Sequence, residues 1–296
     1  MAITQKVLIA GASGYLGRYA VREFKERGYW IRALVRNPEK IKTSGPHGEP
    51  AVFDLVDEIV IGDVTNPESI KGICEGINIV FSALGLTSPD ARYTSFDVDH
   101  VGNGRILKQA IQQHISKYIY VSVFNEDKMP DIPTIKAHEL FVTDLKASGL
   151  SWAVIRPNGY FSDMGRFFSM AQSGHLFMVG EGLKKINPVH GADLAKVCID
   201  AVDGGCCEIP VGGPDIYTFR EIMEMAFLAC GKTPWITSLP LWIAEGALTI
   251  TGLFNQNLAD LLSFAVEALK FDHIAPAHGT RHLKDFFAEL AAKSKS

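Results

Sequence analysis

The stretch Val7-Leu8-Ile9-Ala10-Gly11-Ala12-Ser13-Gly14-Tyr15-Leu16-Gly17 decides the fold. Its first four residues are all apolar, which predicts a short buried strand. Three glycines follow at a spacing of three residues. This spacing is typical of a tight turn from a strand into a helix, where the two backbones must pack closely. The start of that helix leaves N–H groups free, and these favour an anion. The stretch therefore predicts a strand, a turn and a helix that together bind the pyrophosphate of a dinucleotide.

Further apolar runs recur along the first half of the chain and alternate with helical patterns. After the helix that ends near Arg27, helical periodicity returns over residues 101–114. Continuous apolar strands that alternate with helices indicate a parallel sheet covered on both faces. We therefore predict an α/β fold, a doubly wound parallel sheet of the Rossmann type. The predicted strands span residues 7–10, 30–35, 58–61, 79–83, 118–122 and 152–156.

The regular alternation decays after Arg156. Residues 1–156 are predicted to form the dinucleotide-binding domain, and residues 157–296 a smaller C-terminal substrate region packed over the strand ends. Residues 43–50 read as an exposed loop. Asp193 is expected to cap a helix over 194–202. A last helix over 280–293 would turn one apolar stripe to the core, made of Leu283, Phe286, Phe287 and Leu290.

The composition of the chain limits the kinds of partner that it is expected to bind. The formal net charge of −4 gives no general attraction to nucleic acid. The stretch Leu239 to Phe254 is broken by Glu245 and two glycines, so no transmembrane segment is expected. A buried or interfacial helix is favoured there, and a peripheral membrane contact stays open. A homo-oligomer is left open as well.

The N terminus and the cysteines predict a cytoplasmic location. No basic and apolar leader precedes the first strand, and the five cysteines show no Cys-x-x-Cys spacing, which indicates reduced thiols. The neighbours Cys206 and Cys207 are either a redox switch or small hydrophobic residues near a strand. No cluster has a metal-ligand spacing, so no metal is expected.

The second predicted strand ends in Leu34-Val35-Arg36-Asn37. NAD-specific sites carry an acid here, whereas the guanidinium of Arg36 suits a 2′-phosphate, so NADP(H) is the predicted cofactor. A solvated surface arginine is the alternative, and Lys40 either assists or is solvated. Asp63 would accept a hydrogen bond from adenine or cap a helix near Pro67, for which Asn66 is better placed.

With these motifs the chain resembles an atypical short-chain dehydrogenase/reductase, in the NmrA-like and isoflavone-reductase-like branch of NAD(P)H-binding proteins. The resemblance implies a cofactor site across the glycine turn and the strand ends, with a substrate cleft toward the C-terminal region. It also implies that Lys136 contacts the nicotinamide ribose or takes part in proton transfer. The motifs that carry it are Gly11-x-x-Gly14-x-x-Gly17, Arg36, Gly62-Asp63-Val64, Val101-Gly102-Asn103, Lys136-x-x-Glu139, Arg156-Pro157-Asn158 and Asn187-Pro188-Val189-His190-Gly191-Ala192-Asp193-Leu194-Ala195.

The chain departs from the family pattern at the residue that serves as the general acid. Family members with the full set use Tyr-x-x-x-Lys with a nearby serine or threonine, but Ile132 and Phe124 stand at those positions here. Ser122 would reach substrate or bond the backbone. Lys136 and Glu139 are three residues apart and either pair beside the cofactor or form a solvated pair. The sequence leaves the role of His138 open, and it favours a structural role for His190.

These arguments give one predicted catalytic residue, Lys136. The residues predicted to bind NADP(H) are Gly11, Ser13, Gly14, Tyr15, Leu16, Gly17, Arg36, Asp63, Val64, Ala83, Leu84, Gly85, Ser122, Lys136, Pro157, Asn158 and Tyr160. An apolar set either lines a pocket for a flat hydrophobic substrate, such as a quinone, phenolic or tetrapyrrole, or belongs to the core. That set is Tyr160, Phe161, Met164, Phe167, Phe168, Met170 and Met178.

Two functions fit these residues. The first is an NADPH-dependent reductase that transfers a hydride to a hydrophobic conjugated or carbonyl substrate. The second is a non-catalytic NADP(H)-binding redox sensor or assembly factor. The missing tyrosine favours the second and the retained Lys136 favours the first, and the fold alone does not decide between them.

Overall fold

A computed structural model describes residues 4–86 and 92–294 of the chain. The chain divides into two compact units, and both are discontinuous in sequence. The N-terminal unit comprises Met1–Val123, Pro133–Arg156 and Leu194–Ile209, and the C-terminal unit comprises Phe124–Ile132, Pro157–Asp193 and Pro210–Ser296. The sequence suggested one boundary after residue 156, whereas the chain returns to the N-terminal unit for residues 194–209.

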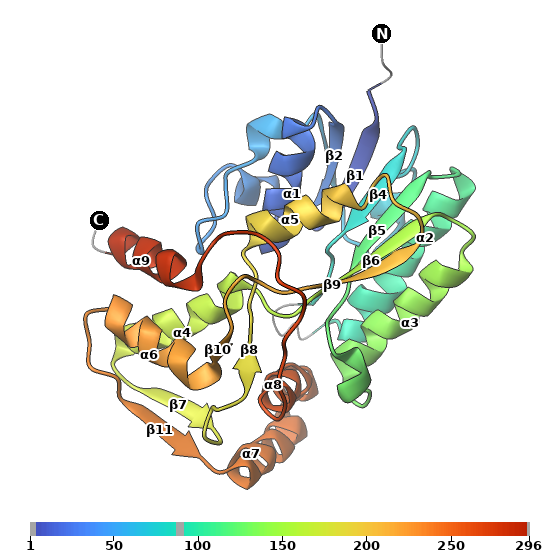
Figure 1. Ribbon diagram of the computed structural model, residues 1–296. Helices are drawn as coiled ribbons and strands as arrows, with labels where there is room; N and C mark the ends of the chain where they lie inside the picture. The colour runs from blue at the N-terminus through green and yellow to red at the C-terminus, as the bar shows by residue number, and fades with distance from the viewer. Residues whose placement is uncertain (1–3, 87–91, 295–296) are drawn as a thin grey trace. The chain divides into compact units, whose positions relative to one another are not determined.

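The N-terminal unit is built on a sheet in the order β3-β2-β1-β4-β5-β6-β9 (Figure 1). The first six strands in that order pair in parallel, which confirms the doubly wound fold. The strand order reverses beside β1, and ligands of open α/β sheets bind at such a switch point. The strands are β1 (Lys6–Ala10), β2 (Trp30–Val35), β3 (Glu58–Ile61), β4 (Ile79–Ser82), β5 (Lys117–Val121), β6 (Trp152–Pro157) and β9 (Cys207–Val211).

Helices cover both faces of this sheet. On one face Phe24 of α1 packs edge-on against Phe81 of β4, with ring centroids 6.1 Å apart. On the other face Leu8 of β1 and Tyr118 of β5 share a core with Phe141 of α3. The helices of this unit are α1 (Tyr15–Glu26), α2 (Asn103–Gln112) and α3 (Pro133–Ala147), with most of α5 (Gly191–Asp200). Short 3₁₀ turns lie at η1 (Pro38–Ile41), η2 (Phe53–Leu55) and η3 (Pro67–Ile70).

The helix predicted over 101–114 is preceded by a π-helical segment, η4 (Phe96–Gly102). Gly102 closes this segment against Val64, and a Cβ on Gly102 would lie 2.6 Å from that side chain. The close approach packs the end of η4 against the segment that follows β3. Segments with this wider hydrogen-bond pattern are rare and are found frequently at functional sites.

The C-terminal unit has a core of its own. Strand β7 (Leu176–Val179) pairs in parallel with β11 (Ile236–Leu239), and β8 (Lys185–Ile186) pairs antiparallel with β10 (Tyr217–Thr218). Its remaining short helix is the 3₁₀ turn η5 (Glu126–Lys128). The core lies between helices α4 (Phe161–Ser173), α6 (Phe219–Ala229) and α9 (Leu283–Lys293). The predicted stripe of α9 is buried as expected, although the helix begins at Leu283 rather than near residue 280.

The apolar set assigned to a substrate pocket belongs mostly to this core. Phe161, Met164, Phe168 and Met178 are buried together, so the core alternative is confirmed for these four. Met170 is 41% exposed. The pocket interpretation is therefore wrong for the buried members, because their side chains already fill the space between the helices of the unit.

Asp193 does not cap a helix, and that prediction is wrong. Helix α5 begins two residues earlier, at Gly191, and Nδ1 of His190 accepts a hydrogen bond from the N–H of Ala192 at its start. The carboxylate of Asp193 instead accepts hydrogen bonds from the N–H groups of Thr280 and Arg281. His190 thus has a structural partner, as expected.

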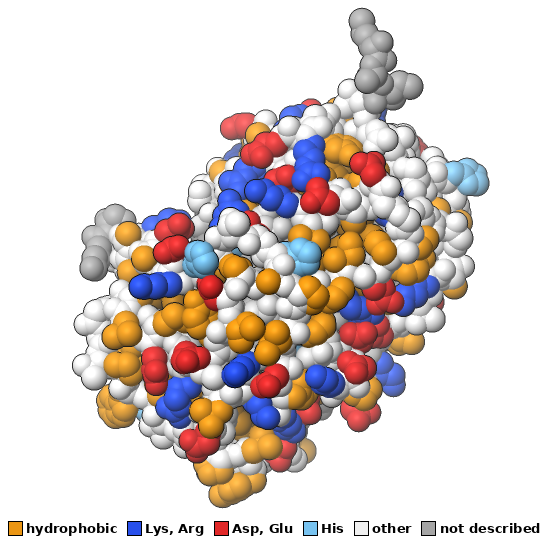
Figure 2. Space-filling model, in the orientation of Figure 1, with side chains coloured by type: hydrophobic (Ala, Val, Ile, Leu, Met, Phe, Trp, Pro, Cys, Tyr) orange, Lys and Arg blue, Asp and Glu red, His pale blue; other side chains and the backbone are white. Residues whose placement is uncertain are grey.

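The stretch around residue 250 forms a helical hairpin of α7 (Leu241–Phe254) and α8 (Gln256–Ala268). The buried-helix alternative is wrong for α7, which has no buried residue. Trp242, Leu253 and Phe254 are 72%, 79% and 87% exposed. Figure 2 shows hydrophobic side chains at the end of the molecule where Figure 1 draws α7. Within the described residues, no helix combines the length and apolarity needed to cross a membrane.

Candidate functional site

The glycine turn has the geometry that the motif requires. Gly11 has φ of +88°, and its carbonyl accepts a 2.9 Å hydrogen bond from the N–H of Gly14. A Cβ on Gly17 would lie 2.0 Å from the carbonyl oxygen of Gly11, so only glycine fits where α1 meets β1. Gly14 is exposed and caps α1 without a side-chain hydrogen bond. The turn thus ends in a helix N terminus without a side-chain cap, and the start of a helix favours an anion.

Arg18, one turn into α1, supports this turn and was missed from the sequence. Its side chain is buried and donates to the carbonyls of Ser13 at 3.2 Å, Thr43 at 2.6 Å and Pro50 at 3.2 Å, and also to that of Lys40. One guanidinium thus fastens the glycine turn to the 40–50 loop. The sequence signal is an arginine with apolar neighbours in the helix, and its role becomes clear only when the position of that loop is known.

Arg36 and Asp63 lie where β2 and β3 end. Arg36 is exposed and makes no hydrogen bond or ion pair within the described residues. Asp63 accepts hydrogen bonds from the N–H and hydroxyl of Thr65 at 2.9 and 2.7 Å. Burial opposes ionisation of Asp63, but these bonds lower its pKa, helped by the charges of Arg36 and Arg92. Asp63 is therefore an anion in a local turn.

The predicted helix cap near Pro67 is wrong. Asn66 begins the 3₁₀ turn η3 without a capping side-chain bond, so neither it nor Asp63 has the predicted capping role. The side chain of Val64 is buried in the core, 5% exposed, and its contact with the cofactor stays a prediction.

Four charged or polar side chains form a chain of contacts beside β5 and β6. Arg156 makes two parallel hydrogen bonds to Glu139, at 2.8 and 2.9 Å, and a third to Glu208 at 2.6 Å. The hydroxyl of Ser122 donates to Glu139 at 2.8 Å. Burial alone would raise the pKa of Glu208, but hydrogen bonds from Lys146 and Arg156 lower it.

This cluster overturns two predictions. Glu139 pairs with Arg156 and not with Lys136, and Ser122 bonds a carboxylate rather than the backbone. Lys136 is exposed and has no hydrogen bond or ion pair within the part of the chain that the structure describes. Its ammonium group is therefore available at the first turn of α3, which begins at the carboxyl edge of the sheet after β5.

His138 lies two residues beyond Lys136 and faces the core. Its Nδ1 is 2.5 Å from the hydroxyl of Tyr120, and its Nε2 is 3.8 Å from Oδ2 of Asp99. Burial lowers the pKa of His138 to about 4, with Glu139 opposing and Arg156 assisting. Burial raises the pKa of Asp99 to about 8, although a hydrogen bond from the N–H of Leu86 opposes this. At neutral pH the histidine is uncharged and the aspartic acid keeps its proton.

Ala83, Leu84 and Gly85 are half-buried where the chain leaves β4. A Cβ on Gly11 would lie 3.0 Å from the carbonyl oxygen of Ala83, so the glycine turn packs against this segment. The glycine turn and the end of β4 therefore form one continuous edge of the N-terminal unit.

Three predicted cofactor residues, Pro157, Asn158 and Tyr160, belong to the C-terminal unit. The side-chain amide of Asn158 donates to the carbonyl oxygen of His273 at 2.6 Å and to the side chain of Asn187. Tyr160 begins α4 in a capping box, and Pro157 is buried. The donor group of Asn158 is therefore engaged within its own unit.

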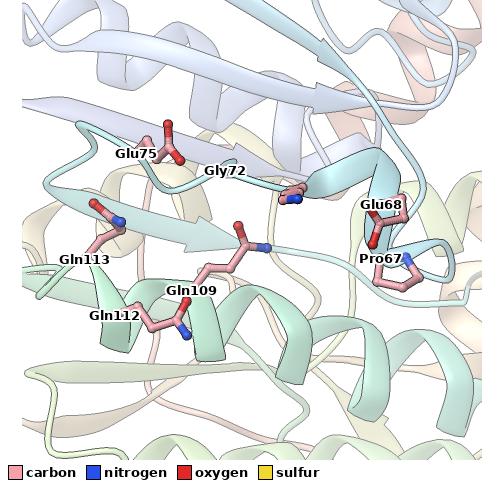
Figure 3. Close-up of a pocket in the computed structure, with 8 residues that line it drawn as sticks. Pro67, Glu68, Gly72, Glu75, Gln109, Gln112 and Gln113 are labelled. Atoms are coloured by element: carbon pink, nitrogen blue, oxygen red, sulfur yellow. The ribbon is translucent and has the colours of Figure 1, made fainter.

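The hollow in Figure 3 is not the predicted site. It has a volume of about 370 Å³ and lies between η3 and α2. Polar side chains such as Glu68, Gln109 and Gln113 line it, and none of its lining residues is a predicted site residue. Within the described residues, no group of three or more His, Cys, Asp or Glu side chains could hold a metal ion.

Comparison with known proteins agrees with this geometry. A family model described as NAD(P)H-binding matches residues 11–204. The "Photosystem II assembly factor Ycf39" of Trieres chinensis is 24% identical, covering 88% of this chain and 80% of the relative. The divinyl chlorophyllide a 8-vinyl-reductase of Zea mays is 26% identical, covering 90% of this chain and 69% of the relative.

Solved structures share the fold. An NADPH-dependent quinone oxidoreductase of Escherichia coli, complexed with NADPH, has a TM-score of 0.73 at 19% identity, covering 98% of this chain and all of that one. A triphenylmethane reductase of Citrobacter sp. has a TM-score of 0.72 at 17% identity, with the same coverage. The match to the family model spans more than half of the sequence, and the motifs quoted from the sequence fall within or beside it. The chain therefore belongs to the NAD(P)H-binding family and has the fold of the atypical short-chain dehydrogenases/reductases.

Proposed function

We propose that the protein is an NADPH-dependent reductase that transfers a hydride to a hydrophobic conjugated or carbonyl substrate. The observation that carries the proposal is the exposed, unpaired Lys136 at the sheet edge that also holds the glycine turn. A cation there suits the nicotinamide ribose and the charge that develops during reduction. Arg36, exposed at the end of β2 where NAD sites carry an acid, supports NADP(H) as the cofactor.

The substrate class rests on chemistry and on the relatives. The names of three similar proteins specify a quinone, a triphenylmethane dye and a divinyl chlorophyllide, which are all conjugated and largely apolar. A hydride acceptor of this kind needs a carbon whose added electrons can spread onto an oxygen or a conjugated system. The cytoplasmic location stays a prediction. The divinyl chlorophyllide a 8-vinyl-reductase of Zea mays is named as a chloroplastic protein.

The test is NADPH oxidation against a panel of quinones, enones and aldehydes. Lys136→Met keeps the apolar stem and removes the charge, so turnover should fall about tenfold or more. Lys108→Met, which removes an exposed lysine from α2, is the matched control and should turn over normally. Equal rates for Lys136→Met and the unmodified protein would refute a catalytic role for Lys136.

A second function, a non-catalytic NADP(H)-dependent sensor or assembly factor, is favoured by one observation. Ile132 replaces the usual tyrosine, and the hydroxyl of Ser122 is held by Glu139. The name of one relative, a photosystem II assembly factor, is consistent with this alternative. It predicts that no member of the substrate panel is reduced, while NADP⁺ and NADPH bind with clearly different affinities in calorimetry.

A further inference from the structure

Asp99, His138 and Tyr120 form a buried polar cluster that the family motifs do not account for. They come from three elements, η4, α3 and β5, and Asp99 and Tyr120 are 0% exposed while His138 is 8% exposed. Polar groups at such depth are almost always fully hydrogen-bonded. Here one atom is not: Oδ2 of Asp99 has no hydrogen-bond partner within the described residues. An orphaned buried oxygen of this kind needs an explanation.

The geometry orients the cluster. Oδ1 of Asp99 accepts the N–H of Leu86 at 2.8 Å, which fixes the plane of the carboxyl group. The hydroxyl of Tyr120 lies 2.5 Å from Nδ1 of His138, and in the tautomer in which that hydroxyl donates to Nδ1 the ring proton is on Nε2. That Nε2–H faces Oδ2 of Asp99 across 3.8 Å, too far for a hydrogen bond in the resting protein.

Gly85 lies against this cluster. Apart from its chain neighbours, a carbon at the Cβ position of Gly85 would meet nothing nearer than 3.8 Å, and the atoms at that distance are Oδ1 of Asp99 and Cε1 and Nε2 of His138. Gly85 itself is half-buried and follows β4, beside the glycine turn. A ligand atom lying over Gly85 would therefore be in contact distance of both side chains.

We propose that Asp99 is the proton donor of this site, in place of the tyrosine that the chain lacks, and that His138 and Tyr120 position it. The inference rests on the proposed reductase function. Bound NADPH supplies a hydride to a substrate carbon. The electron pair of the C=O bond moves onto the substrate oxygen, and that oxygen takes the proton of the Asp99 carboxyl group.

The carboxylate left behind is stabilised at both oxygens. The N–H of Leu86 remains on Oδ1, and the Nε2–H of His138 faces Oδ2. A proton from solvent then restores the acid, so one hydride and one proton enter the product in each turnover. Since the acid is neutral at rest, no charge is buried before the reaction begins.

The charged neighbours of the cluster are paired among themselves. Glu139 and Arg156 neutralise each other, and His100 on η4 pairs with Asp144 on α3 at 2.8 Å. These pairs leave no cation in contact with Asp99 that would force it to ionise. The other titratable groups on the elements packed against the cluster are Asp97 on η4, Lys136 and Lys146 on α3, Arg105 and Lys108 on α2, and Lys117 and Tyr118 on β5.

The first measurement needs no substrate. Difference infrared titration of the full-length protein should show a protonated carboxyl band at pH 7 that disappears around pH 8 and is missing in Asp99→Asn. Asparagine has nearly the same shape and is uncharged, like the acid it replaces, so the fold should be kept. Asp97→Asn, two residues earlier on η4 and only half-buried, is the matched control and should keep the band. A wild-type spectrum without such a band at pH 7 overturns the proposal.

The second measurement uses NADPH with a soluble quinone. Turnover of the wild type should fall as pH rises through about 8, because the acid loses its proton. The turnover of Asp99→Asn should be at least about tenfold lower than that of the wild type, and it should no longer fall as pH rises through about 8. Its affinity for NADPH should be unchanged within about twofold. Tyr120→Phe should turn over more slowly but still lose activity as pH rises through about 8, because it removes only the contact that orients His138.

The outcomes separate the two proposals. If the wild type reduces the quinone but Asp99→Asn keeps both its turnover and its loss of activity above about pH 8, the assignment of Asp99 as proton donor is wrong. The proposal that the protein is a reductase is then unaffected. If the wild type reduces no member of the panel, the reductase proposal fails and the donor role fails with it, whatever the infrared band shows.

Discussion

The two ends of the same sheet edge are built in different ways. At β1 the glycine turn is made by neighbours in sequence, and it is held by a backbone hydrogen bond from Gly14 to Gly11 and by the close approach of Gly17. At β4 and β5 the chemistry comes from residues far apart in the chain: His138 lies against Tyr120 and near Asp99, and Arg156 pairs with Glu139. A local site tolerates change in the rest of the fold, whereas an assembled one depends on burial and pairing.

The largest expected effect is at the glycine turn. Gly17→Ala would place a Cβ 2.0 Å from a backbone oxygen and should cost about 3 kcal/mol of unfolding free energy, with loss of cofactor binding. Gly14→Val, at an exposed position, should keep the fold but weaken NADPH binding by about 100-fold or more, or ~2.7 kcal/mol. Denaturant unfolding and calorimetry measure the two effects. Tight binding in folded Gly14→Val would show that the dinucleotide lies elsewhere.

The next effect tests the assembled end. Glu139→Gln leaves the buried guanidinium of Arg156 without one of its two carboxylates and should lower the unfolding free energy by about 2 kcal/mol. Glu39→Gln, which breaks the exposed pair with Lys42, should cost less than about 1 kcal/mol. Similar losses from both substitutions would mean that the Arg156 cluster behaves as a surface pair.

The buried acid makes stability depend on pH. Asp99 keeps its proton in the folded state up to about pH 8, while the unfolded chain releases it near its usual value of 3.8. Between pH 6.5 and 8 the unfolding free energy should therefore fall by about 1.4 kcal/mol per pH unit as pH rises. Asp99→Asn should remove this slope. Between pH 6.5 and 4 the lowered pKa of His138 adds a slope of opposite sign, so the two contributions nearly cancel and the unfolding free energy should change little there.

The smallest effect concerns cofactor choice at the local end. NADPH should bind about tenfold tighter than NADH, or ~1.4 kcal/mol, because the guanidinium of Arg36 pairs with the 2′-phosphate. Arg36→Asp should erase or reverse the preference, and Arg36→Lys should keep only part of it, since lysine lacks the planar fork. Calorimetric titration with both cofactors decides. Equal affinities for NADPH and NADH in the unmodified protein would refute the assignment of Arg36 to the 2′-phosphate.

The sequence by itself determined the sheet and the turn. Strands β2 and β3 have the predicted bounds, and the glycine positions agree with the geometry, because a buried parallel strand and a tight turn leave a local signature in residue type. The stripe of α9 was predictable for the same reason, since one helix face is read from spacing alone.

Only the tertiary structure decided which side chains are engaged. Spacing suggested that Lys136 pairs with Glu139, but Arg156 arrives from another strand and forms the stronger bidentate contact. The Met and aromatic set around α4 could line a pocket or fill a core, and packing against α6 and α9 decided for the core. His138 and Asp99 carried no sequence signal, because the protonation of a side chain depends on burial and on partners that the folded chain brings together.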